Sequence, residues 1–434
     1  MRTIPRPDRR YRLRVAEREL DVIVFGATGI TGRRVAAYLA ERSPETGASW
    51  AAAARDAAKV ERVLDEDGVT APETIVADVD DPESLLAMAS RGKVVLDLVG
   101  PYTRFGRPVI EACVEGGAQY VDLTGEIPFV RQVIDEFDTR AADAGVKVVQ
   151  VCGFESLPPD LAVLLATETA RERWDESLAE ADLELVVEGP PGAPRPSDIS
   201  GGTLQSVAEI AASEDASIFT DPAALITDPV AAAEVRRRSP TSVAPRRSGE
   251  AVIAPMAPAA FMNPPVVHRS AALLAAEGDR AFEPFRYREG VALRGSAATL
   301  PLRYAAAGAL SGFQALLGAA TRTPPSTRRR VGSALRRVLP SSGFGPSGDR
   351  LDRWRWRISL EARTTGSRNV RIEVDAEGHP GYLATARMLG EVGLLLAEPD
   401  ATPDRAGCLT PATAVGTSGI DRFDRARVRF SVSP

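Results

Sequence analysis

The sequence is poor in the residues that build disulfides and transition-metal sites. Its 434 residues include three cysteines, Cys113, Cys152 and Cys408, and two histidines, His268 and His379. An odd number of widely spaced cysteines excludes a disulfide framework and fits a reducing cytosol. No zinc-ligand spacing appears, and no nucleophile-elbow pattern accompanies either histidine to suggest a Ser-His-Asp triad. We therefore expect a cytoplasmic protein without a metal site.

A basic face and a long apolar run are also missing. The net charge of −6 and the pI near 5.4 argue against a nucleic-acid partner, which needs a basic surface. Residues 1–20 are charged and contain two prolines, so we interpret them as an N-terminal extension and not a signal peptide. The longest apolar stretch, 304–320, is rich in alanine and glycine and contains Gln314. A bilayer span needs about 20 apolar residues, so we expect a buried helix here.

Short apolar runs alternate with amphipathic stretches from residue 21 to residue 160. The expected strands are 22–25, 49–54, 74–77, 94–99, 119–122 and 146–151. The expected helices are 32–42, 56–67, one that begins at Asp81 and Pro82, 108–115 and 128–144. This alternation predicts an α/β fold built on a Rossmann-like, doubly wound parallel sheet.

The pattern changes after Gly153. Helices are expected at 161–169, 201–213 and 381–398, and strands at 183–188, 353–360 and 370–374, the last two alternating like antiparallel strands. Loops are expected at 189–198 and at 239–250, the second polar and exposed. We therefore expect a second, α+β domain that contains a mixed or antiparallel sheet.

A glycine-rich turn lies between the first expected strand and the first expected helix. It is Gly26-Ala-Thr-Gly29-Ile-Thr-Gly32, a G-x-x-G-x-x-G variant of the dinucleotide fingerprint. Gly26 permits the tight turn, Gly29 lets the backbone approach a pyrophosphate, and Gly32 lets the helix pack on the strand. The helix start then offers free N–H groups to phosphates. The expected cofactor contacts are Gly26, Thr28, Gly29, Ile30, Thr31 and Gly32.

Three further segments refine the cofactor prediction. Arg55 ends the second strand with Lys59 one turn later, which favours a 2′-phosphate and hence NADP(H), although Asp56 lies beside them. Asp78 closes the third strand and suits either an adenine contact or a cap that leads into the next helix. Gly100, Pro101 and Tyr102 follow the fourth strand, where ribose and nicotinamide bind, although Gly-Pro is also turn chemistry by itself.

Several motifs together resemble the saccharopine dehydrogenase-like oxidoreductases, and within them the actinobacterial trans-acting enoyl reductases. The resemblance covers most of the chain. Its motifs are Val24-Phe-Gly-Ala-Thr-Gly-Ile-Thr-Gly32, Leu98-Val-Gly-Pro-Tyr-Thr-Arg-Phe-Gly106, Tyr120-Val-Asp-Leu-Thr-Gly-Glu126, Gly153-Phe-Glu-Ser-Leu-Pro-Pro-Asp160, Ser200-Gly-Gly-Thr203, Gly381-Tyr-Leu-Ala-Thr-Ala-Arg-Met388 and Leu409-Thr-Pro411. Glu155 stands where similar sequences usually carry aspartate.

The resemblance implies a division of the chain and a reaction. It implies an extension at 1–20, a Rossmann NADP-binding domain at 21–160, an inserted substrate and oligomerisation domain at 161–378, and a segment at 379–434 that returns to the first domain. It implies an NADPH-dependent reductase of an enoyl thioester in lipid or polyketide metabolism. A saccharopine-type C–N oxidoreductase and a non-catalytic NADP-binding scaffold on membranes or lipid bodies stay open as alternatives.

The catalytic residues are expected where the strands end. Tyr102 is the first candidate for a proton donor or oxyanion partner, with ring packing under the nicotinamide as its alternative. Thr124 and Ser156 are further hydroxyl donors. Glu155 would orient substrate or ribose, or else cap the helix that begins near Pro158.

The expected partners follow from the same reasoning. An acyl thioester or other small molecule is the expected substrate, and a homodimer is the expected assembly. Arginines crowd the segment 321–340, which holds no acid. That segment suits a membrane surface or an acidic acyl-carrier domain, and a solvated loop and helix is the plainer alternative.

Overall fold

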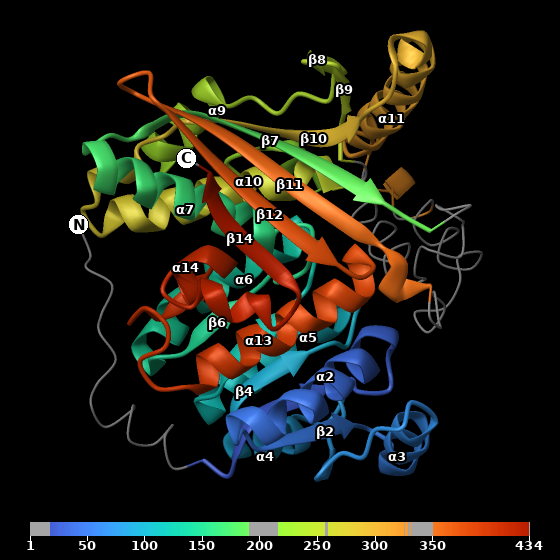
Figure 1. The fold of residues 1–434 in the computed structure, drawn as a ribbon. Coiled ribbons are helices and arrows are strands. Elements are labelled where there is room, and N and C mark those ends of the chain that lie inside the picture. The colour runs from blue at the N-terminus through green and yellow to red at the C-terminus, as the bar shows by residue number, and fades with distance from the viewer. Residues whose placement is uncertain are drawn as a thin grey trace.

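The fold is that of a computed structural model, which describes residues 18–190, 216–256, 259–324, 326–328, 330 and 350–433. Two seven-stranded sheets organise these residues, one above the other in Figure 1. The helix expected at 201–213 and most of the loop expected at 189–198 lie outside the described residues.

The first sheet is parallel throughout and has the order β13-β6-β5-β4-β1-β2-β3. Its strands are β1 (Leu20–Phe25), β2 (Trp50–Ala54), β3 (Thr74–Val76), β4 (Gly92–Asp97), β5 (Gln119–Asp122), β6 (Lys147–Val149) and β13 (Gly407–Leu409). Val22 and Val24 enter one hydrophobic core, and Ile23 and Phe25 enter another on the opposite face. Burial on both faces explains why the strand reads as a continuous apolar run. The predicted Rossmann-like sheet is confirmed.

Helices cover both faces of this sheet. Side chains of α2 (Ile30–Thr46), α3 (Ala57–Glu66) and α13 (Thr385–Ala397) share the core of Val22. Those of α4 (Pro82–Arg91), α5 (Tyr102–Gly116) and α6 (Ile127–Ala144) share the core of Ile23. The predicted start of α4 is confirmed, because the Asp81 carboxylate accepts the N–H groups of Glu83 and Ser84.

The second sheet is mixed, with the order β14-β12-β11-β7-β10-β9-β8. Its strands are β7 (Leu178–Glu188), β8 (Arg246–Ser248), β9 (Ala251–Ala254), β10 (Arg286–Leu293), β11 (Arg355–Thr364), β12 (Asn369–Glu377) and β14 (Val428–Ser433). Strands β7 and β10 pair in parallel and the other pairs are antiparallel. This confirms the predicted mixed sheet. One of its faces packs on α7 (Leu157–Trp174), which lies beside α10 (Asn263–Ala276).

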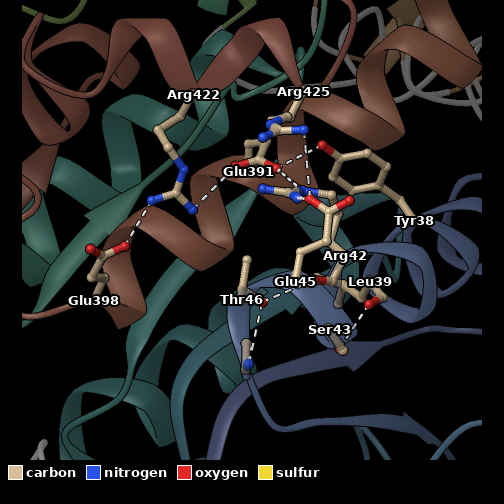
Figure 2. A network of polar contacts seen from close by, with 11 residues as sticks. Tyr38, Leu39, Arg42, Ser43, Glu45, Thr46, Glu391, Glu398, Arg422 and Arg425 are labelled. Carbon is tan, nitrogen blue, oxygen red and sulfur yellow. Dashed lines mark hydrogen bonds and ion pairs between the residues drawn. The ribbon is translucent and has the colours of Figure 1, made fainter.

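The chain beyond residue 378 contacts both sheets. Strand β13 extends the first sheet beside β6, whereas β14 extends the second beside β12. Helix α13 is held to α2 by the fully buried Glu391, which accepts hydrogen bonds from the Tyr38 hydroxyl and from Arg42 Nε, both at 2.7 Å. Figure 2 shows this carboxylate between the side chains of α2 and Arg422. The domain boundaries themselves stay a prediction.

Two predictions about burial are wrong. Helix α11 (Leu300–Ala320) forms as expected but is mostly exposed, and its buried side chains include the polar Arg303 and Gln314. The segment 239–250 is not wholly an exposed loop, because it contains β8 and because the buried Ser239 hydroxyl accepts the N–H of Tyr287. The composition of a segment does not reveal which of its side chains another segment of the chain covers.

Candidate functional site

The glycine-rich turn has the geometry of a phosphate cradle. Gly26 has φ of +89°, and a Cβ on Gly32 would lie 2.2 Å from the Gly26 carbonyl oxygen, so only glycine allows α2 to start this close to β1. Gly29 caps α2, and the first helical hydrogen bond runs from Arg33 N–H to the Gly29 carbonyl. The N–H groups of Ile30 and its two successors therefore have no helical acceptor and point out of the helix start.

The end of β2 leaves a cation exposed beside this turn. Arg55 follows β2 directly and makes no hydrogen bond or ion pair with any described residue. The neighbouring Asp56 caps α3 by accepting the N–H of Lys59, so this carboxylate is engaged in local structure. Asp78, after β3, is half-buried and accepts the Asp80 N–H. The cap of α4 is Asp81, so the capping role weighed for Asp78 is not observed.

The segment after β4 differs from the expected loop. Gly100 and Pro101 are joined by a cis peptide bond, and α5 already begins at Tyr102. Glu126 explains the early start: its buried carboxylate accepts the N–H groups of Tyr102, at 3.1 Å, and Thr103, at 2.8 Å. This carboxylate arrives from the loop after β5, so no local pattern in 100–108 could reveal it. The Glu126 carboxylate thereby offsets the positive end of the α5 dipole, whereas no such carboxylate from the described residues lies at the start of α2.

The Tyr102 side chain is turned into the core. Its hydroxyl is buried and donates to the Asp97 backbone carbonyl at 3.0 Å. Burial, with Asp122 and Asp97 nearby, raises the pKa of this phenol well above its ordinary value. A buried, already donating hydroxyl is poorly placed to protonate a substrate, so the geometry does not favour the catalytic role expected for Tyr102, which stays a prediction.

Two buried carboxyl groups lie under the ends of β4 and β5. The Tyr120 hydroxyl is 3.1 Å from Asp97 Oδ2 and 2.9 Å from Asp122 Oδ2, and both aspartates are fully buried. Burial raises the pKa of Asp122 to about 6 and that of Asp97 well above its ordinary value. Because two adjacent carboxylates repel each other, the pair retains a proton more readily than isolated aspartates.

Asp122 also fixes the two loops that follow β5 and β6. Its Oδ1 accepts the N–H of Thr124 at 3.0 Å and that of Val151 at 3.1 Å. Val151 has φ of +64°, a conformation that is costly for a β-branched residue. Such strain persists where surrounding contacts impose it, and it clusters at functional sites. The loop after β6 is therefore held in one defined shape.

This loop, 151–156, joins the two sheets. The Phe154 ring packs edge-on against Trp356 of β11, with ring centroids 4.8 Å apart, and its N–H donates to the Thr385 hydroxyl. A Cβ on Gly153 would lie 2.9 Å from Glu155 Oε2, so the glycine makes room for that carboxylate. Burial raises the pKa of Glu155. Ser156, not Glu155, occupies the cap position of α7, so the capping role weighed for Glu155 is not observed.

A chain of hydrogen bonds leads from this loop into the second sheet. The buried Ser156 hydroxyl donates to Asn263 Oδ1 at 2.7 Å, and Asn263 Nδ2 donates to Glu289 Oε2 at 2.8 Å. The Tyr287 hydroxyl donates to the same Glu289 oxygen at 2.8 Å. We call these four residues the Ser156–Glu289 chain. It connects the end of β6 to β10 through the first residue of α10.

Glu289 has one oxygen left over. Its Oε1 atom is buried and has no hydrogen-bond partner among the residues that the structure describes, and burial raises the pKa of the carboxyl group to about 7. A carboxyl group with this pKa is partly protonated at neutral pH and can donate as well as accept. The nearby His268 packs against Phe285 and Tyr287 with both ring nitrogens unbonded, and burial lowers its pKa to about 4, so it is a neutral packing residue.

The expected site residues thus gather at one edge of the first sheet. The glycine turn, Arg55, Asp78, Tyr102 and the loop 151–156 all follow the carboxyl ends of parallel strands, where ligands of such sheets bind. The sequence missed the roles of Glu126, Asn263 and Glu289. Glu126 ends the Tyr120–Glu126 motif, but Asn263 and Glu289 are more than 100 residues from Ser156, and no local pattern marks them.

A separate hollow of about 460 Å³ lies on the second sheet. It is lined by Trp356, Arg357, Asp375, Arg427 and neighbouring residues, and none of the expected site residues lines it. Arg357 and Asp375 already form an ion pair at 2.6 Å. Within the described ranges, no group of three or more potential ligands is placed to hold a metal ion.

Known proteins support the cofactor and the reaction type. Residues 22–149 match the model of the saccharopine dehydrogenase NADP-binding domain. A Mycobacterium tuberculosis protein provisionally assigned as a trans-acting enoyl reductase is 36% identical over 433 residues, covering 96% of this chain and 98% of the relative. The trans-acting enoyl reductase of Mycobacterium ulcerans is 34% identical, covering 96% of this chain and 99% of the relative. NADP(H) as cofactor and the NADP-dependent oxidoreductase class are confirmed.

The fold has a solved counterpart. Apo saccharopine dehydrogenase (L-Glu forming) from Saccharomyces cerevisiae superposes with a TM-score of 0.50 at 14% identity, covering 95% of this chain and 99% of that chain. At this identity the likeness concerns the fold alone. By its near-complete match to the mycobacterial relatives, the chain belongs to the trans-acting enoyl reductase family of saccharopine dehydrogenase-like oxidoreductases.

Proposed function

We propose that this chain reduces the carbon–carbon double bond of an α,β-unsaturated acyl thioester. The observation that carries the proposal is the 34–36% identity, over nearly the full length of both chains, to proteins named trans-acting enoyl reductase. When bound, NADPH supplies the hydride for the β-carbon. The protein must then hold the cofactor and the thioester in register and supply a proton to the α-carbon.

The cofactor contacts divide by the part of the molecule they hold. The N–H groups of Ile30, Thr31 and Gly32 bind the pyrophosphate, and the neighbouring Gly26, Thr28 and Gly29 shape the turn around it. Arg55 and Lys59 bind the 2′-phosphate. Asp78 contacts the adenosine, and Gly100 and Pro101 lie along the ribose and nicotinamide. The free side chain of Arg55 and the cradle that a Cβ on Gly32 would fill support this assignment.

Glu289 is the better candidate for the proton donor. Its carboxyl group has an unpartnered oxygen and a pKa near 7, whereas the hydroxyls of Tyr102 and Ser156 already donate to protein acceptors. The Ser156–Glu289 chain orients it from the end of β6, and the hydrogen bonds from Asn263 and Tyr287 hold its second oxygen. Glu155, near the start of this chain, positions the substrate.

The acyl group arrives on a carrier domain. Enzymes that act in trans receive their substrate from another protein, and the relatives carry that description in their names. A free enoyl thioester of coenzyme A or N-acetylcysteamine presents the same reacting atoms and is the simplest probe.

The first test separates cofactor, substrate and proton donor. Titration with NADPH and with NADH is followed by turnover of enoyl thioesters by wild type, Glu289→Gln and the matched surface control Glu361→Gln, whose side chain is 74% exposed. We expect NADPH to bind all three proteins equally. Turnover by Glu289→Gln should fall about 10²–10⁴-fold, the usual contribution of general acid catalysis, while the control keeps wild-type turnover.

The pH dependence gives the proposal its sharpest readout. Because the Glu289 carboxyl must be protonated to donate, wild-type turnover should fall as the pH rises above about 7, and this limb should be absent in Glu289→Gln. NADPH binding without thioester reduction would exclude the substrate class and leave the cofactor site intact. Wild-type turnover and an unchanged pH limb in Glu289→Gln would exclude this glutamate as the donor.

A further inference from the structure

Helix α11 presents an apolar stripe to solvent. Leu302 is 72% exposed, Phe313 49% and Leu316 68%, and the exposed Ala306 and Ala309 lie between them at helical spacing. From Leu302 to Leu316 the stripe is about 21 Å long at the rise of an α-helix. Figure 1 shows α11 at the edge of the molecule, next to β9.

In α11 the polar side chains face the protein and the apolar side chains face solvent. Its single charged residue, Arg303, is turned inward and is 7% exposed; it donates to the backbone carbonyls of Glu250, Leu293 and Ser296 at 2.6–3.1 Å. Gln314 is fully buried on the same side. A helix at a protein surface ordinarily shows charged residues to water and apolar ones to the core. The outward face of α11 carries no charged residue. An exposed apolar face of this kind is typical of a surface that binds a partner or a membrane.

The charged residues that flank α11 in the sequence are all of one sign. From Gly290 to Gly348 the sequence contains no aspartate or glutamate and has arginine at 294, 303, 322, 328, 329, 330, 336 and 337, in a chain whose net charge is −6. Arg322, two residues after the helix, and Arg330 are exposed. An exposed apolar stripe next to uncompensated arginines is the combination that binds anionic lipid surfaces.

We propose that α11 is a docking surface for an anionic lipid bilayer, with the apolar stripe at the level of the acyl chains and Arg322 and Arg330 against the lipid phosphates. An acidic protein partner accounts for the arginines alone, whereas the bilayer accounts for both features. A two-fold dimer through α11 would bring two acid-free, arginine-rich segments into one interface. In the part of the chain that the structure describes, no helix is long and apolar enough to cross a membrane.

Vesicle co-sedimentation tests the proposal on the full chain. The vesicles are phosphatidylcholine alone, or phosphatidylcholine with an equal part of phosphatidylglycerol. Wild type should sediment with the anionic vesicles, less with the neutral ones, and less again as salt is added. The double variant Phe313→Glu/Leu316→Glu should bind at least about tenfold more weakly, because the loss of two inserted side chains adds to charge repulsion.

A matched control removes the effect of charge alone. Leu86→Glu/Val230→Glu places the same two carboxylates on exposed apolar side chains elsewhere, 38% exposed on α4 and 76% exposed on α9 (Pro229–Arg238), and should bind vesicles nearly as well as wild type. Unchanged NADPH affinity in all variants shows that they are folded. Equal binding of the double variant and wild type would overturn the proposal, as would wild type left in the supernatant with both vesicles. A wild-type dimer that the double variant converts to a monomer would assign the stripe to a second copy of this chain instead.

Discussion

At the scale of single residues, the cofactor end of the site follows from covalent geometry and local charge. Gly26 is required by its positive φ, and Gly32 is required because a Cβ there would lie 2.2 Å from the Gly26 carbonyl oxygen. Both effects act within the glycine-rich turn itself. Arg55 is equally local, because it is the first residue after β2. In the sequence, the neighbouring Asp56 argued against NADP(H). In the structure, this carboxylate caps α3, so it is engaged in local structure.

Arg55 offers a direct test of the assignment. Replacing it in Arg55→Asp removes a cation from the 2′-phosphate and places an acid where a ribose hydroxyl of NADH would lie. We expect the Kd for NADPH to rise about tenfold to hundredfold, as loss of a charge-assisted hydrogen bond implies, and the preference to move toward NADH. Arg62→Asp makes the same charge change on an exposed position of α3 and should leave the preference unaltered. Identical behaviour of the two variants would remove Arg55 from the site.

At the scale of elements, polar contacts between distant helices decide where each helix begins and how it is held. Glu126, from the loop after β5, lets α5 start at Tyr102 and not near residue 108. Glu391 anchors α13 to α2 across more than 340 residues of sequence. Both acids are buried, and neither partnership is visible in a window of neighbouring residues.

We expect the loss of Glu391 alone to destabilise the protein, and the replacement of both Glu391 and Arg42 by apolar residues to be better tolerated. Glu391→Leu leaves the nearly buried Arg42 with only the exposed Glu45 as its ionic partner and should lower the free energy of unfolding by up to about 3–5 kcal/mol. The double variant Arg42→Met/Glu391→Leu should recover part of that loss, because an apolar pair leaves no buried charge unpaired. The exposed Glu398→Leu should change it by less than about 0.5 kcal/mol. Urea denaturation measures all three, and a double variant less stable than the single one would contradict this account.

At the scale of the whole molecule, buried acids join segments that are far apart in the chain. Asp160 of α7 accepts the Ser270 hydroxyl of α10 at 2.6 Å and the Ala412 N–H of α14 (Pro411–Val415) at 2.9 Å. Burial raises its pKa from 3.8 to about 7. Between about pH 4 and pH 7 the Asp160 carboxyl group therefore keeps its proton in the folded chain and loses it in the unfolded chain. The resulting stabilisation is complete below about pH 4 and is lost as the pH rises through about 7.

Asp160→Asn should expose this linkage. The variant lacks the ionisation, so its free energy of unfolding should fall less steeply than that of wild type between about pH 4 and pH 7, by up to about 1.4 kcal/mol per pH unit. Any constant difference reflects the altered hydrogen bond to Ala412. Asp65→Asn, at an exposed position of α3, should follow the wild-type slope. Denaturation curves at a series of pH values measure the slopes, and parallel curves for Asp160→Asn and wild type would refute the linkage.

The sequence by itself determined the parallel sheet and the glycine turn, and it predicted NADP(H) as cofactor, because strand alternation, glycine spacing and the residue after β2 are short-range properties. It also placed a mixed second sheet, whose alternating strands are equally local. Only the tertiary structure decided that Tyr102 turns into the core, that Asn263 links Glu289 to Ser156, and that α11 shows its apolar side to solvent. The physical reason is shared: burial and hydrogen-bond partnership depend on which distant segment covers a residue, and composition within one segment does not encode that.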